Sequence, residues 1–320
     1  MDRNLALEFV RITEAAALAS SRWMGRGDEK KADQAAVDAM RKAFDTVRID
    51  GTVVIGEGER DQAPMLYIGE KVGVKEGGNT AVDIALDPLE GTTICARGSV
   101  GAISVIAIAE AGKFLHAPDV YMDKIAVGPN CVGKVSIDNS PTENIKAVSK
   151  ALNKQISEVT VIILDRPRHE NLIKEVRGTG ARIQLIGDGD VSAAVACSME
   201  NTGIDMLLGV GGAPEGVISA AALKCMGGDF QGRLVFHRDE QRERAKRMGI
   251  ADINRAYSLN DLAGGQVMFC ATGVTDGPLL KGVKFLSNGK VTTHSVVMRS
   301  KTGTIRNIEA VHNPDKIKML

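Results

Sequence analysis

The sequence predicts an α/β fold made of two packed halves. Three observations lead to this prediction: apolar residues recur at helical spacing in the first 44 residues, short β-branched runs follow, and strand and helix patterns alternate through the second half. At 320 residues the chain is long enough for two cores, since domains commonly contain ~100–200 residues. A turn cluster at 138–141 favours a boundary there, so we expect one half over 1–140 and another over 141–320.

Two helices are expected to open the fold. Apolar residues on one helical face are Leu5, Phe9, Ile12, Ala16, Ala19 and Trp23. Gly25 and Gly27 then end this segment. A second helical pattern covers about 28–44, with alanines along one face, and stops before a turn at Gly51. Small residues on a shared face favour close packing of the helix.

Strands are expected next, first in a series and then in alternation with helices. The β-branched runs bounded by Gly or Pro are 52–55, 81–86 and 103–108. In the second half, the expected strands 159–164, 182–186 and 204–208 precede helices that follow Pro167, Asp190 and Pro214. A doubly wound sheet of this kind places ligands at the carboxyl ends of its strands.

Composition narrows the class of partner. Forty basic residues balance forty acidic ones and aromatic residues make up 3%, so no nucleic acid partner is expected. No apolar run approaches the ~20 residues of a membrane span, and charges interrupt the first twenty positions, which argues against a secretory signal. We therefore expect a cytoplasmic protein with a small-molecule partner. The five cysteines form no C-x-x-C pair, which favours buried free thiols.

The strongest chemical signal is an apolar run that ends in two carboxylates. Asp87 and Glu90 stand three residues apart, Pro88 sets a turn between them, and Gly91 lets the backbone approach closely. Carboxylate oxygens of this kind suit Mg²⁺ or Mn²⁺. A polar β-turn with an Asp cap is the alternative for this motif taken alone.

A second strand end repeats this chemistry. After the apolar run 53–55, glycines separate several acidic residues, among them Glu57 and Asp61. Clustered acids repel one another unless a cation neutralises them, although a solvated turn is the alternative. The segment lacks the third glycine of a dinucleotide fingerprint, and the chain contains no P-loop motif.

Two arginines and a pair of aspartates follow later strands. Arg166 and Arg168 flank Pro167 between a strand and a helix, where guanidinium groups can bind a phosphate; a charged loop is the alternative. Asp188 and Asp190 end the next strand, and their carboxylates suit sugar hydroxyls.

A glycine-rich turn opens one of the later helices. Gly212 and Pro214 precede Glu215, which stands in the first turn of the expected helix. A glutamate there can bind a ligand, or it can simply complement the helix dipole.

Taken in order, these motifs resemble the class II fructose-1,6-bisphosphatases, bacterial members of the lithium-sensitive phosphatase superfamily that includes the inositol monophosphatases. The blocks that carry the resemblance are 13–16, 22–25, 54–59, 63–70, 87–92, 117–124, 188–190 and 211–216, so it covers almost the whole chain. It implies a layered αβαβα sandwich of the sugar phosphatase type. It also implies a homo-oligomer, either a homodimer or a homotetramer.

The resemblance implies a set of site residues. The metal ligands, for two or three Mn²⁺ or Mg²⁺ ions, would be Asp33, Glu57, Asp87, Glu90 and Glu215. The substrate contacts would be Glu90, Gly91, Thr92, Tyr121, Arg166, Pro167, Arg168, Asp188, Gly189, Asp190 and Gly212. Thr92 would orient the attacking water together with a carboxylate, either Asp33 or Asp61.

The implied activity is removal of the 1-phosphate of fructose 1,6-bisphosphate by a metal-activated water, which gives fructose 6-phosphate and phosphate in gluconeogenesis. Alternatives are a dual fructose and sedoheptulose bisphosphatase, an inositol-monophosphatase-like enzyme, and a non-catalytic sugar-phosphate sensor. The arginine pair favours a bisphosphate, and retention of Thr92 with every metal carboxylate argues against a sensor.

Overall fold

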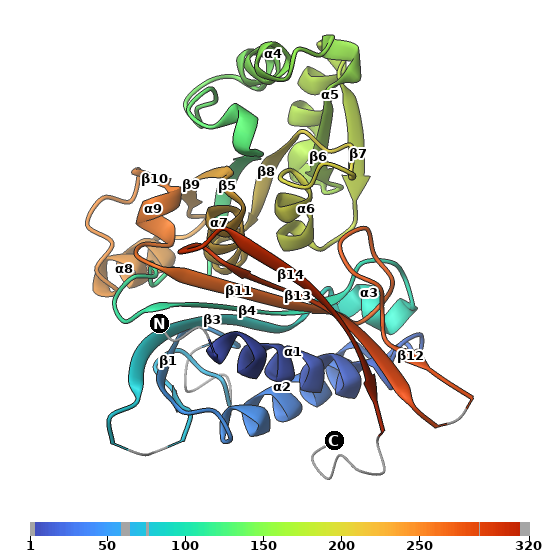
Figure 1. Ribbon diagram of the computed structural model, residues 1–320. Helices are drawn as coiled ribbons and strands as arrows, with labels where there is room; N and C mark the ends of the chain where they lie inside the picture. Colours follow the sequence, from blue (N-terminus) through green and yellow to red (C-terminus); the bar gives the residue numbers. More distant parts are fainter. Residues whose placement is uncertain (1–3, 59–64, 75–76, 288, 314–320) are drawn as a thin grey trace. The chain divides into compact units, whose positions relative to one another are not determined.

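Figure 1 shows the computed structural model, which describes residues 4–58, 65–74, 77–287 and 289–313. The chain forms two compact units: unit 1 comprises Met1–Phe114 and Gly265–Leu320, and unit 2 comprises Leu115–Gly264. These bounds differ from the expected halves 1–140 and 141–320, because the last strands of the chain pair with strands from its beginning. The turn cluster at 138–141 instead begins a helix, where Ser140 and Glu143 form a capping box.

Unit 1 contains one mixed sheet and three helices among its described residues. The helices are α1 (Leu5–Ser21), α2 (Glu29–Phe44) and α3 (Thr92–Arg97). The strands are β1 (Ile49–Ile55), β2 (Lys71–Val72), β3 (Thr80–Glu90), β4 (Ile103–Glu110), β11 (Val267–Gly273), β12 (Lys284–Phe285), β13 (Val291–Arg299) and β14 (Thr304–His312). The sheet has the order β12-β13-β11-β4-β3-β1-β2, with β14 paired to β13.

The two N-terminal helices form as their apolar spacing predicts. Asp28 caps the start of helix α2: its carboxylate accepts a hydrogen bond from the Lys31 N–H over 3.1 Å. Both helices pack against each other and against strands of the sheet (Figure 1). Large side chains that are fully buried in this core include Phe9, Phe44 and Met40.

One pair of strands in unit 1 brings two carboxyl ends together. Strands β1 and β3 are parallel, whereas the other strand pairs of this sheet are antiparallel. The carboxyl ends of two parallel neighbours meet at one edge of a sheet. Residues that follow β1 and residues that end β3 therefore lie close together.

Unit 2 alternates strands and helices around a second mixed sheet. Its strands are β5 (Tyr121–Val127), β6 (Thr160–Leu164), β7 (Arg182–Ile186), β8 (Met206–Gly212), β9 (Asp229–Val235) and β10 (Ala256–Ser258), in the order β10-β9-β5-β8-β6-β7. Its α-helices are α4 (Pro141–Leu152), α5 (Glu170–Gly178), α6 (Asp190–Ala196), α7 (Ala213–Met226), α8 (Asp239–Arg247) and α9 (Leu259–Leu262). Short 3₁₀ turns are η1 (Pro129–Cys131), η2 (Ile156–Glu158) and η3 (Pro167–His169).

Both units combine a sheet with packed helices, which confirms the predicted α/β class. The five cysteines are all free and buried, as the sequence predicts. Across the part of the chain that the structure describes, none of the helices has both the length and the apolar character needed to cross a membrane.

Candidate functional site

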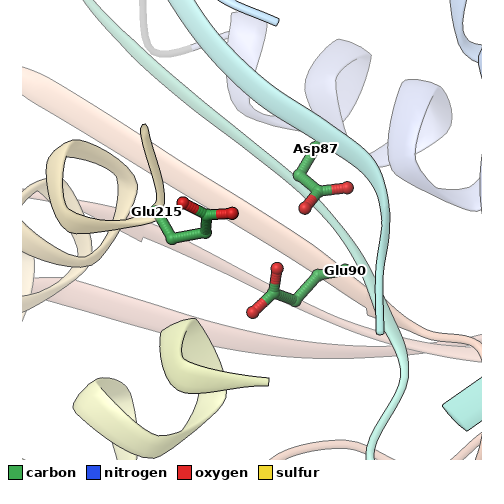
Figure 2. A group of neighbouring side chains, drawn as sticks. All are labelled: Asp87, Glu90 and Glu215. Carbon is green, nitrogen blue, oxygen red and sulfur yellow. The ribbon is translucent and has the colours of Figure 1, made fainter. Parts of the chain in front are cut away.

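Two carboxylates at the end of β3 form the centre of the candidate site in unit 1. A bulge interrupts the β3–β4 pairing between Asp87 and Glu90, so these residues escape the strict alternation of a strand. A ligand oxygen of Asp87 lies within 4.8 Å of one of Glu90, and Figure 2 shows the two carboxylates projecting from the same strand. Asp87 is partly buried and Glu90 is buried. The structure thus brings together the two residues of the strongest sequence motif.

Glu57 and Asp33 add two further acidic groups near this pair. Glu57 follows the end of β1, and Asp33 lies in the first half of α2. Burial, followed by the charges of Asp87 and Asp33, raises the pKa of Glu57 to about 8. Burial also raises the pKa of Asp33.

This set of groups fits a hard divalent cation. All four side chains offer carboxylate oxygens, the ligands that Mg²⁺ and Mn²⁺ prefer. Burial and, after it, the charges of Asp87 and Asp33 disfavour the ionised form of Glu57, and a bound cation would favour that form. Four of the five predicted metal ligands therefore belong to one unit and suit one kind of ion.

Gly91 and Thr92 follow the carboxylates directly. Gly91 caps helix α3 with a φ of 88°, a left-handed conformation that favours glycine. Thr92 is the first residue of α3 and is partly buried. Asp61, the other predicted partner of Thr92, lies outside the described residues.

The predicted phosphate-binding arginines lie in unit 2, between β6 and α5. The Nε and Nη2 atoms of Arg168 donate to the carbonyl oxygen of Val210 over 3.0 and 2.7 Å. Its guanidinium carbon lies 4.8 Å from the centre of the Tyr121 ring, and the ring of His237 contacts Tyr121 edge-on at 5.5 Å. The structure therefore brings Arg168 and Tyr121 together as a pair. Arg166 is partly buried just before the 3₁₀ turn.

Pro167 begins the turn η3 that separates these two arginines. Its fixed φ suits the first position of a helical turn, where a backbone N–H has no partner within the helix. Pro167 therefore favours the backbone turn that separates Arg166 from Arg168.

Asp190 has a partner that the sequence did not predict. It begins α6 after Gly189, whose φ is 84°. Its carboxylate lies 2.7 Å from the Nζ atom of Lys124 on β5, and both side chains are buried. Gly211 passes this ion pair so closely that a Cβ there would collide with Asp190. Asp190 thus connects α6 with β5, while Asp188 remains at the carboxyl side of β7.

Glu215 lies in the first turn of α7, as the sequence predicts. Figure 2 also labels this carboxylate. Within unit 2, a Cβ on Gly212 would collide with the Glu215 carboxylate. Glycine at position 212 therefore leaves the space that the glutamate occupies.

Sequence reasoning missed two buried polar residues of unit 2, Lys124 and His169. Lys124 is 2% exposed in β5, and His169 is 2% exposed at the end of η3. Lys124 precedes the apolar run 125–127, and a lysine beside such a run was a signal for a buried partner, but its partner stands 66 residues away in the sequence.

Comparisons with known proteins identify the family. A family model described as "Bacterial fructose-1,6-bisphosphatase, glpX-encoded" matches residues 3–312. This chain belongs to that family. Two proteins named D-fructose 1,6-bisphosphatase class 2/sedoheptulose 1,7-bisphosphatase are similar to it. One, from Synechococcus elongatus, is 47% identical, with 99% of each chain covered. The other, from Synechococcus sp. (strain JA-2-3B'a(2-13)), is 45% identical, with 98% of this chain and 97% of the relative covered. The predicted resemblance to class II fructose-1,6-bisphosphatases is confirmed.

Membership in this family makes the chain an enzyme, a phosphatase of the hydrolase class. A solved structure of inositol monophosphatase from Anabaena (Nostoc) sp. PCC 7120 matches 61% of this chain and 73% of its own, at 17% identity and a TM-score of 0.31. A TM-score this low does not establish a shared fold.

Proposed function

We propose that this enzyme removes the 1-phosphate of fructose 1,6-bisphosphate by attack of a metal-activated water, which gives fructose 6-phosphate and phosphate in gluconeogenesis. Fructose-1,6-bisphosphatase activity follows from its family. The observation that carries the mechanism is the gathering of acidic side chains at two strand ends of unit 1: ligand oxygens of Asp87 and Glu90 lie within 4.8 Å of each other, and burial together with the charge of Asp87 raises the pKa of Glu57. A bound cation would offset both causes.

The metal ligands in this proposal are acidic residues from both units. They are Asp33, Glu57, Asp87, Glu90 and Glu215, and they would hold two or three Mn²⁺ or Mg²⁺ ions. The bound ions would neutralise phosphate oxygens and lower the pKa of a water molecule. Support for Glu215 is the resemblance, which places the fifth carboxylate of the family at this position. In this proposal unit 1 supplies most of the metal ligands, and unit 2 supplies one ligand and the substrate clamp.

Thr92 orients the attacking water in this mechanism. Its hydroxyl can accept a hydrogen bond from water and donate one to a carboxylate. Its position at the start of α3, directly after Glu90 and Gly91, supports this role, because the backbone turns there beside the carboxylates. Asp33 is the partner that we propose for the hydroxyl, with Asp61 as the other candidate.

The second phosphate of the substrate binds to the arginines of unit 2. We define Arg166 and Arg168, with Pro167 between them, as the clamp. Guanidinium groups bind phosphate through paired N–H donors, and the two bonds from Arg168 to Val210 hold that side chain in one orientation. The remaining substrate contacts in this proposal are Glu90, Gly91, Tyr121, Asp188, Gly189, Asp190 and Gly212.

Sedoheptulose 1,7-bisphosphate is a second candidate substrate. The observation that favours it is the double activity in the names of the Synechococcus relatives. Both substrates carry a distal phosphate that the clamp can bind, so the clamp alone does not select between them. We further propose that the enzyme acts in the cytoplasm as a homodimer or homotetramer; its five free thiols suit a reducing compartment.

A substrate panel tests the proposed function. Phosphate release from fructose 1,6-bisphosphate, sedoheptulose 1,7-bisphosphate and inositol 1-phosphate is measured with Mn²⁺, with Mg²⁺ and with a chelator. We expect turnover of a bisphosphate only with metal. Asp33→Asn should abolish turnover, whereas Asp38→Asn, an exposed position on the same helix, should not. Full turnover in chelator, or equal activity of the two variants, would contradict the metal mechanism.

A further inference from the structure

The imidazole of His169 bridges two strands at the point where their pairing stops. Strands β6 and β8 are parallel, and their last paired residues are Ile162 and Leu207. Beyond this pair, Nδ1 of His169 lies 2.6 Å from the carbonyl oxygen of Leu164, and the Val210 N–H donates to Nε2 over 2.8 Å. The ring therefore takes the place of the next backbone hydrogen bond between the two strands.

These two bonds determine the protonation of the ring. A backbone N–H can only donate, so Nε2 must be the unprotonated acceptor for Val210. Nδ1 then carries the proton and donates it to Leu164. His169 is only 2% exposed, so water does not take over either bond.

Gly209 makes room for the ring. Its φ is +126°, and a Cβ at this position would lie 2.9 Å from Nε2 of His169. A side chain there would both strain the backbone and push the ring away from Val210. The backbone of β8 is thus shaped to receive this histidine.

The same peptide that binds His169 also binds the clamp. The Val210 N–H contacts the His169 ring, while the Val210 carbonyl accepts both bonds from Arg168. The backbone N–H of His169 donates to the carbonyl oxygen of Arg166 over 2.9 Å. His169 therefore holds both arginine residues, one through its backbone and the other through the Val210 peptide.

We propose that His169 is a positioning residue, whose neutral imidazole fixes Arg168, through the Val210 peptide, in the orientation that binds the distal phosphate of a sugar bisphosphate. It acts through Arg168 and does not touch the substrate. This inference rests on the proposed function, in which the clamp binds a phosphate.

Protonation of His169 should release the clamp. A proton on Nε2 would face the Val210 N–H, and two donors cannot share a hydrogen bond. Burial is the main cause that lowers the pKa of His169, and the charges of Arg168 and Arg166 lower it further; the bond to Leu164 and the charge of Asp123 oppose them. A small cavity beside the ring is also lined by the paired side chains Lys124 and Asp190.

The sign of the pH effect follows from this lowered pKa. The folded protein prefers the neutral ring, so the contribution of His169 is complete above its ordinary pKa of 6.5 and is lost as the pH falls through the lower, folded value. The affinity of the clamp for phosphate should fall in the same range of pH.

Binding of fructose 6-phosphate, which keeps the distal phosphate, tests the proposal. We compare the parent enzyme, His169→Gln, and the exposed control His116→Gln in the presence of Mn²⁺. His169→Gln should raise the Kd for fructose 6-phosphate and the KM for fructose 1,6-bisphosphate by roughly 5- to 20-fold, the scale of one or two weakened hydrogen bonds. Its kcat should stay within about three-fold of the parent value, because the reacting phosphate binds elsewhere.

A pH series separates positioning from a general packing defect. The Kd ratio of His169→Gln to the parent should be largest near pH 8 and approach one at acid pH, where the parent ring is protonated. Titration of the phosphate group itself cancels in this ratio. A constant ratio would overturn the role of the neutral ring.

A ¹⁵N spectrum of the parent enzyme provides an independent test if His169→Gln does not fold. The ring should show a proton on Nδ1 at pH 8, and a proton on Nε2 would overturn the proposal. If the parent neither hydrolyses fructose 1,6-bisphosphate nor binds fructose 6-phosphate, both the proposed function and the proposed phosphate binding by the clamp are wrong. If the parent does both and a folded His169→Gln matches it, only the role of His169 fails.

Discussion

Thr92 begins α3 beside the carboxylates, and its replacement gives the first prediction. Thr92→Ala should lower kcat by ~10²–10⁴ with little change in KM, because a misaligned water loses its attack geometry while substrate binding persists. Thr92→Ser keeps the hydroxyl and should recover much of the rate. Steady-state kinetics with fructose 1,6-bisphosphate provide the measurement.

The adjacent Thr93 supplies the control for this prediction. Thr93→Ala changes the same helical turn and should leave kcat near the parent value. If Thr92→Ala were as active as the parent, the orienting role would pass to the acidic residues.

Glu57 predicts how the stability of the metal-free enzyme depends on pH. Its pKa is about 8 in the folded protein and 4.5 ordinarily, so the folded state retains a proton that the unfolded state releases. This contribution to the free energy of unfolding is complete below pH 4.5 and is lost as the pH rises toward 8, by on the order of 4 kcal/mol. Urea unfolding in chelator at pH 5.5 and pH 8 measures the loss.

Glu57→Gln should remove most of this pH dependence, because the amide does not titrate. Added Mn²⁺ should stabilise the parent most strongly at pH 8, where the carboxylate is charged, and should stabilise Glu57→Gln less. Equal effects of metal on both proteins would show that Glu57 is not a ligand.

At this scale the sequence predicted short motifs better than long-range partners. Asp87 and Glu90 lie three residues apart, and Gly91 follows directly. Their proximity could therefore be predicted from a short sequence motif. The partner of Asp190 could not be predicted in this way, because Lys124 comes close to Asp190 only when the strands of the sheet have paired. The bridging role of His169 likewise depends on Val210, which is 41 residues away in the sequence.

Strand β5 and helix α6 are connected by the buried ion pair Lys124–Asp190, which predicts a change in stability. Lys124→Met should lower the free energy of unfolding by ~3–5 kcal/mol, because it leaves a buried carboxylate without its counter-charge. Lys134→Met, at an exposed position of the same unit, should change it little. Chemical denaturation of both variants is the measurement. A double variant that also carries Asp190→Asn should regain part of the loss.

Most elements could be predicted because their patterns are local. Apolar spacing predicted α1 and α2, and β-branched runs predicted β1, β3 and β4 close to their observed positions. Strand β3 extends to Glu90, beyond the expected end at residue 86, because pairing with β4 resumes after the bulge. Pairing between distant strands supplies that extension, and no local pattern encodes it.

At the scale of the whole molecule, unit 1 needs both ends of the chain. Strand β11 pairs with β4 over seven residue pairs, and the unit 1 core includes Met268, Cys270 and Val297. A chain that stops at Gly264 should therefore leave β4 as an open edge beside an incomplete core. We expect rapid proteolysis within residues 1–114 of this truncated chain, and a proteolysis pattern like that of the intact enzyme would contradict the prediction.

The return of the chain to unit 1 also sets an order of events on the ribosome. Because synthesis runs from the N-terminus, Leu115–Gly264 emerges as one continuous segment with all its own strands. Residues 1–114 emerge earlier but must wait for β11 and β13, which are made more than 150 residues later. During this interval the apolar surface of β4 lacks its partner strand. The nascent chain is therefore most exposed to aggregation in residues 1–114, which are synthesised first.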